Sequence, residues 1–254
     1  MKKLDFLLLN LARTSIASLV LAAPALYFGF GHGAYYALLS GAITLAVGDT
    51  FFLLSIREMG ASIAAPVAYT YVLFVQLTAA AVGEVVPSAN LVAALMVVAG
   101  VYVLSKGEGR PRTRGMALGI GAGIVWTIGQ DLIGLATEAG GNVFAIAFSR
   151  DFAASLALAA AVVATGRFRT WPRGMERKEL GFLGLVVVSD LVVGSVFYVY
   201  SVSLIGVAVT VILTSLSPLL TQVFSKALGK ESPSGRDFAG GVLIVSAVLL
   251  AVIL

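Results

Sequence analysis

The sequence predicts an all-α fold, a polytopic bundle of membrane-spanning helices. Composition, long apolar runs and the placement of basic residues all predict it. Of the 254 residues, 59% are hydrophobic and 12% are charged. Soluble domains carry about 45–50% apolar and about 25% charged residues. Because a soluble surface needs far more polar atoms than this chain supplies, lipid is the solvent that the composition suits.

Runs of about 20 mostly apolar residues are long enough to cross the hydrocarbon core of a bilayer. Short breaks with turn-forming residues, such as "EAGGN" and "KESPSG", separate these runs. The pattern predicts about nine transmembrane helices: Leu4–Phe28, Ala34–Ile56, Ala61–Val82, Ser88–Leu104, Gly115–Leu135, Asn142–Ala164, Glu179–Tyr200, Gly206–Ala227 and Asp237–Leu254.

Lysine and arginine fall in alternate breaks. Lys2 and Lys3 open the chain, the "GHG" break has none, and the alternation continues to the C-terminal "AVIL", which has none. Because cytoplasmic loops carry the excess of basic residues, a multi-pass protein of the cell membrane with a cytoplasmic N-terminus is predicted. The net charge of +4 is then explained by the basic residues of cytoplasmic loops, which set the orientation of the helices. We therefore expect no nucleic-acid partner.

Three pairs of segments resemble each other in the same order. "LARTSIASLVLAA" resembles "FSRDFAASLALAA", which aligns Arg13 with Arg150. "GDTFFLLSIREMGASIA" resembles "GSVFYVYSVSLIGVAVT", and "AVGEVVPS" resembles "ALGKESPS". Matching spans are five apart, and an odd offset inverts their orientation. We therefore predict an inverted repeat of four plus five helices, residues 1–106 and 115–254, with the basic loop 107–114 between them.

On these residues the chain resembles the EamA-type permeases of the drug/metabolite transporter superfamily over nearly its whole length. The arginine in a repeat's second helix fits Arg13 and Arg150. The tryptophan near the start of a repeat fits Trp126, and the Ser-x-Pro of the fourth helix fits Ser217 and Pro218.

The resemblance implies two inverted five-helix repeats that move small solutes. The Gly-Glu pair before a fifth helix fits Gly83 and Glu84. Against the family pattern, the first copy lacks its opening helix and has Val72 where Pro218 would align. The resemblance implies that both termini lie in the cytoplasm, whereas the loop charges here predict a C-terminus outside the cell.

Five of the charged residues inside the predicted spans are candidates for a solute or ion pathway. They are Asp190, Asp49, Asp131, Arg13 and Arg150. A charge at the bilayer centre costs at least about 2.5–3.5 kcal/mol on insertion scales, so such residues face a cavity or a partner. A carboxylate could take up a proton, and an arginine could hold an anionic group of the solute. The alternative interpretation is internal ion pairing that fixes helix register.

Aromatic residues and one proline complete the candidate pathway. Trp126 and Tyr71 could form walls of a substrate cavity, or they could serve helix packing. Pro218 is predicted to break a helix inside the membrane, either at a transport site or as a packing kink. Gly115, Gly119 and Gly123 form a small-residue face that permits close helix packing within the chain or between two copies.

Several chemistries are missing from the sequence. The chain has no cysteine and one histidine, His32, which disfavours a thiol nucleophile or a metal site. It has no P-loop and no motif of a serine or zinc hydrolase. We therefore expect a protein that is not an enzyme, with no catalytic residues, no cofactor and no metal.

These patterns predict a secondary active transporter, a permease or exporter of small metabolites such as amino acids. It would work by alternating access between the repeats, with proton coupling as one option. Its partners would be a small-molecule solute, the lipid bilayer and, as a further option, a second copy in a homodimer. Two alternatives stay open: a non-transporting structural or regulatory membrane subunit, and a membrane enzyme acting on lipid.

Overall fold

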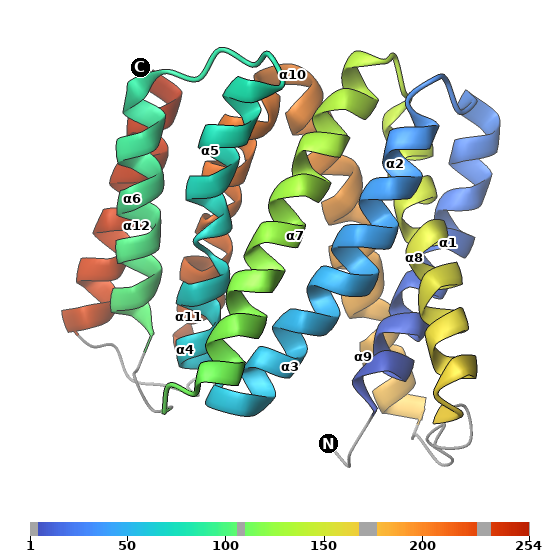
Figure 1. The fold of residues 1–254 in the computed structure, drawn as a ribbon, viewed down its shortest axis with the longest axis horizontal. Helices are drawn as coiled ribbons and strands as arrows, with labels where there is room; N and C mark the ends of the chain where they lie inside the picture. The colour runs from blue at the N-terminus through green and yellow to red at the C-terminus, as the bar shows by residue number, and fades with distance from the viewer. Residues whose placement is uncertain (1–4, 106–109, 168–176, 228–234, 254) are drawn as a thin grey trace. The chain divides into compact units, whose positions relative to one another are not determined.

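The computed structural model describes residues 5–105, 110–167, 177–227 and 235–253, and every regular element within these ranges is a helix (Figure 1). Contacts divide the chain into two compact units. Unit 1 comprises Met1–Thr50 and Ile128–Leu204, and unit 2 comprises Phe51–Thr127 and Ile205–Leu254. Each unit takes segments from both predicted repeats. Packing and sequence repetition are different properties, so the repeat boundaries remain a prediction.

Unit 1 is organised around the helix pair α1 and α8. The hydroxyl groups of Ser15 on α1 and Ser155 on α8 lie 2.6 Å apart, and α8 also packs against α2 and η1. Both long helices begin with a side-chain cap, Asp5 on the Leu7 amide and Asn142 on the Phe144 amide, each at 2.9 Å. The elements of unit 1 are α1 (Phe6–Phe28), α2 (Ala34–Gly41), η1 (Ala42–Gly48), α8 (Val143–Ala164), α9 (Arg177–Val187), η3 (Val188–Gly194), the end of α7 (Thr113–Glu138) and the start of α10 (Ser195–Thr214).

The core of unit 1 is a layer of aliphatic side chains between these helices. Close backbone contact adds to it at Gly41, because a Cβ there would overlap the carbonyl group of Arg150. Helix α2 therefore ends directly against the backbone of α8 at a charged residue. The buried apolar residues of this core are Leu7, Leu8, Ala17, Leu45, Ala46, Ala154, Leu158, Val162, Val187 and Leu191.

Unit 2 contains a second close helix pair, α6 and α12, which lie side by side (Figure 1). A Cβ on Gly240 would lie 2.9 Å from the carbonyl oxygen of Gly100, so small residues allow these backbones to approach. The elements of unit 2 are most of α3 (Asp49–Met59), α4 (Ala61–Ala68), α5 (Tyr71–Ala81), α6 (Ser88–Leu104), the start of α7, the end of α10, α11 (Leu216–Ala227) and α12 (Gly235–Ile253).

Seven helical stretches among the described residues are long and apolar enough to cross a membrane. The predicted count of nine is not confirmed by this criterion. Leu180–Leu220 forms one stretch of 41 residues where two spans were predicted, and Ser88–Leu104 is a shorter apolar helix of 17 residues. The other stretches are Phe6–Phe28, Ala34–Met59, Ala61–Ala81, Thr113–Glu138, Val143–Ala164 and Gly235–Ile253.

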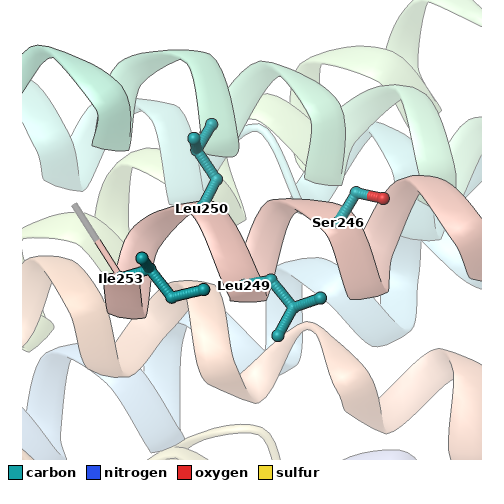
Figure 2. A pocket seen from close by; sticks show the side chains of 4 residues that line it. All are labelled: Ser246, Leu249, Leu250 and Ile253. Carbon is teal, nitrogen blue, oxygen red and sulfur yellow. The ribbon is translucent and has the colours of Figure 1, made fainter.

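A depression of about 350 Å³ lies on α12 and is lined by Ser246, Leu249, Leu250 and Ile253. Figure 2 shows that all four side chains come from this one helix. Leu249 and Ile253 are exposed, and the lining is almost entirely aliphatic. Such a surface suits lipid chains, and Ser246 supplies the one polar side chain of this lining.

Candidate functional site

Unit 1 brings together charged side chains from four separate parts of the sequence. We call Arg13, Asp49, Arg150, Asp151 and Asp190 the charged cluster. At its edge, Arg13 on α1 donates from Nη2 to Oδ2 of Asp190 in η3 at 2.8 Å. The side chain of Arg13 is 22% exposed and that of Asp190 is 60% exposed. The ion pair therefore joins a largely enclosed cation to a carboxylate at the surface of the described structure.

Arg150 is the buried cation of the charged cluster. It lies on α8, and its Nη1 donates to the Ser195 hydroxyl in a long hydrogen bond of 3.4 Å. The groups that interact with it electrostatically include Asp151, Asp49 and Tyr198. Four of the five charged residues predicted from the sequence are thus brought together.

Asp151 is a member of the cluster that the sequence did not single out. Its side chain is 0% exposed, and neither carboxyl oxygen has a hydrogen-bond partner among the described residues. The charged groups that act on it are Arg150, Arg13, Asp190 and Asp49. The sequence could have indicated Asp151 by its position next to Arg150 in the middle of an apolar run. Two adjacent charges in a membrane span carry a high free-energy cost of transfer into lipid.

Irregular backbone positions the acidic members of the cluster. Asp190 lies within the π-helical segment η3, and Asp49 directly follows the π-helical segment η1. The wider turn of a π-helix changes the face on which the following side chains lie, and such segments are frequent at functional sites. The side chain of Asn10 on α1 donates to the Leu45 carbonyl of η1 at 2.7 Å, which ties the first π-helical segment to the adjacent helix.

Unit 2 assembles an aromatic group around Trp126. The indole ring packs edge-to-face against Tyr71 with ring centroids 5.6 Å apart. It also packs against Phe52 in a tilted arrangement with centroids 5.1 Å apart. Tyr69 packs on the other side of Tyr71 at 5.9 Å. The Tyr71 and Thr214 hydroxyl groups lie 3.3 Å apart. Trp126 and Tyr71, both predicted as site residues, are therefore neighbours in one hydrogen-bonded aromatic group.

Glu84 holds a broken helix in unit 2. Gly206 has a φ of 79° within α10, in a region of backbone space that favours glycine. The two amides that follow the break, those of Val207 and Ala208, donate to the Glu84 carboxylate, each at 3.0 Å. A carboxylate on free amides at the start of a helix is stabilised by the helix dipole. The sequence pointed to Glu84 only through the Gly-Glu pair of the family pattern.

The last two predicted residues lie elsewhere. Asp131 is buried in the part of α7 that belongs to unit 1, and it is not among the groups that act on Arg150 or Asp151. Pro218 lies in the first turn of α11, which begins at Leu216, and a proline is tolerated there because the first-turn amide has no partner within the helix. The chain leaves helical structure at Ser215, before Pro218.

Comparison with known proteins adds to this geometry. The sequence model of the EamA-like transporter family matches residues 1–106 and 113–253. The chain belongs to the EamA-like transporter family. It is therefore a multi-pass membrane transporter of the drug/metabolite transporter type, as the sequence motifs predicted.

The fold of this EamA-like chain is also found among solved structures. A crystal structure of a protein aligns with a TM-score of 0.84 over 99% of this chain and 88% of its own chain, at 17% sequence identity. At that identity the likeness concerns the fold alone. No curated protein matches the sequence.

Proposed function

We propose that this EamA-like protein is a secondary active transporter that exports small metabolites such as amino acids across the cell membrane. The observation that carries the proposal is the Arg13–Asp190 ion pair, which joins helices inside the apolar spans Phe6–Phe28 and Leu180–Leu220. Such a pair can hold the two ends of a zwitterion.

The exposure of Asp190 supports an aqueous path. Its side chain is 60% exposed, and a carboxylate facing lipid at that depth would cost at least about 2.5–3.5 kcal/mol. Water or a bound solute in contact with Asp190 removes that cost. The charged cluster then lines the path taken by the solute.

The chemistry of the pair favours amino acids as the solute class. A solute carboxylate matches the planar guanidinium of Arg13, and a solute ammonium group matches Asp190. An amino acid supplies both groups, so it can replace the internal partners of each side chain at little electrostatic cost. A purely hydrophobic solute gains nothing from this arrangement.

The number of crossings in the proposal is nine. A helix of 41 residues such as Leu180–Leu220 would be about 60 Å long, about twice the hydrocarbon thickness of a bilayer. The non-helical conformation of Gly206 divides this stretch into two crossings. Helix α6, with 17 residues, lies at the lower end of the length that spans a bilayer.

Several local features recur in the order that an inverted repeat requires. The π-helical segments Ala42–Gly48 and Val188–Gly194 each precede a helix that ends at a glycine of positive φ, Gly60 at 83° and Gly206 at 79°. These pairs have the same separation along the chain, and they support alternating access between two inverted repeats. The orientation in the proposal has the N-terminus in the cytoplasm, because the basic residues alternate between loops.

The test is solute release from proteoliposomes loaded with a pool of amino acids and other small metabolites under an imposed pH gradient. Mass spectrometry measures the solutes that remain. The proposal predicts selective loss of one solute class with the unaltered protein and little loss with Asp190→Asn or with empty liposomes. Retention of every solute by folded, inserted protein would favour a non-transporting membrane subunit.

A further inference from the structure

We propose that Asp151 is the proton-binding site of this transporter, protonated while Arg13 is paired with Asp190 and ionised when that pair opens. The inference rests on the proposed function and supplies its coupling step. It makes the protein an antiporter that exchanges a proton for a solute.

The first argument is the environment of Asp151. Its side chain is 0% exposed, and neither carboxyl oxygen receives a hydrogen bond from a described residue. An ionised carboxylate without hydrogen bonds is so unfavourable in a medium of low dielectric that the group binds a proton instead. The observed arrangement therefore fits the neutral acid.

The second argument is the charge balance of the cluster. Two arginines, Arg13 and Arg150, face three aspartates, Asp49, Asp151 and Asp190. One proton on an aspartate makes the cluster neutral, which is the state that a bilayer tolerates best. Asp190 already accepts from Arg13 at 2.8 Å and is the most exposed of the three, so the proton belongs on the enclosed Asp151.

Among the described residues, the elements packed against α8 supply few titratable groups, and α10 adds Tyr198, which acts on Arg150. Helix α1 brings Arg13 to the site. The sequence of η1, AITLAVG, carries no titratable residue. Helix α2 carries Tyr35 and Tyr36 at the end away from Gly41, where it meets Arg150. Asp49 and Asp190 complete the set of charges that act on Asp151.

Solute binding would move the proton in one balanced step. A zwitterionic solute that pairs with Asp190 through its ammonium group releases Arg13 from that carboxylate. The O–H bond of Asp151 then breaks and its proton passes to water in the path. The new carboxylate shares the Arg13 guanidinium, which has five N–H donors, with the carboxylate of the solute. Solute departure reverses the step, so each solute carried in one direction is exchanged for one proton in the other.

Infrared spectroscopy of the full-length protein in nanodiscs tests the site, with the proton itself as the probe. At neutral pH the protein is expected to show the carbonyl stretch of a protonated carboxyl group, and one group's share of that band should be lost in Asp151→Asn. Asp190→Asn removes the partner of Arg13 and should lose that share as well, whereas the control Gly184→Ala, where a Cβ meets no atom within 4 Å, should keep it. A spectrum of Asp151→Asn with the same band as the unaltered protein, or no such band in the unaltered protein, would overturn the proposal.

A second variant covers failure of Asp151→Asn to fold. In protein grown on isotope-labelled aspartate, the band of Asp151 is shifted, and Asp151→Glu should return it to the unlabelled position. A band that stays shifted in Asp151→Glu would contradict the assignment. Because these spectra need no solute, a correct band assignment in a protein that moves no solute would mean that the proposed function fails while the proton site stands.

Discussion

Arg13 on α1 and Asp190 in η3 form an ion pair with 2.8 Å between Nη2 and Oδ2, although 177 positions separate them in the sequence. The pair joins the two sequence halves of the chain inside unit 1. Because both partners lie in apolar spans, each one makes the other tolerable in the bilayer. The pair is therefore a support of the fold and, in our proposal, the place where the solute competes.

Neutralising one partner should destabilise the protein more than neutralising both. Arg13→Gln or Asp190→Asn leaves one charge without its partner, and we expect each to lower the free energy of unfolding by about 1–3 kcal/mol. The double variant should recover part of that loss, because no charge remains unpaired. Unfolding in detergent or nanodiscs measures the cycle. Losses that simply add in the double variant would show that the pair contributes no coupling energy.

Replacing Gly206 should lower the stability of unit 2. In Gly206→Ala, the residue would need a φ of 79°, and its Cβ would overlap the Glu84 carboxylate. Backbone strain alone costs about 1–3 kcal/mol, so the unfolding temperature should fall clearly. The matched control is Gly184→Ala, because a Cβ there meets no atom within 4 Å. A Gly206→Ala protein as stable as this control would refute the account of the break.

Replacing Glu84 should weaken the same break from the other side. Glu84→Ala removes the acceptors of the Val207 and Ala208 amides, and losing a helix cap costs about 0.5–2 kcal/mol. Glu84→Gln keeps one acceptor oxygen and should fall between Ala and the unaltered protein. Thermal unfolding of the three proteins gives the order. If Gln and Ala are equally destabilising, the charge rather than the hydrogen bonds holds the helix start.

The charged cluster should be reachable from water, and the chain allows a clean test because it has no cysteine. Ser195→Cys places a thiol beside Arg150, whose Nη1 lies 3.4 Å from the native hydroxyl. A membrane-impermeant thiol reagent should modify it. The control Leu156→Cys lies on α8 at a side chain that is 58% exposed and that we expect to face lipid, so it should react far more slowly. Equal rates at the two positions would argue against an aqueous path at the cluster.

Much of the helical layout was predictable from apolar runs and their breaks. The predicted span Ser88–Leu104 has the bounds of α6, and the span Asn142–Ala164 begins one residue before α8, at the Asn142 cap. The breaks around Gly60 and Gly206 were also expected, because glycine and short loops interrupt the apolar pattern. Length and composition decide these features locally, which is why the sequence suffices for them.

The sequence did not reveal which face of each helix is buried. In α8 nearly every position is apolar, so no polar stripe marks the outside as it does in a soluble protein. The burial of Asp151 and the contact of Arg13 with Asp190 depend on that rotation, and on the π-helical turns that shift it. The position of the helix break near Pro218 was also not predicted correctly to the residue. The helix ends in a turn at Ser215, three residues before the proline.

The central claim is that the charged cluster moves a solute, and countertransport in proteoliposomes tests it most directly. Labelled solute outside should enter faster when the same solute is present inside, because an alternating-access carrier returns more quickly when loaded. We predict this stimulation for the unaltered protein and for Gly184→Ala, and its loss in Asp190→Asn. Equal stimulation in Asp190→Asn would contradict the role of the Arg13–Asp190 pair, and no stimulation in any folded, inserted protein would contradict transport itself.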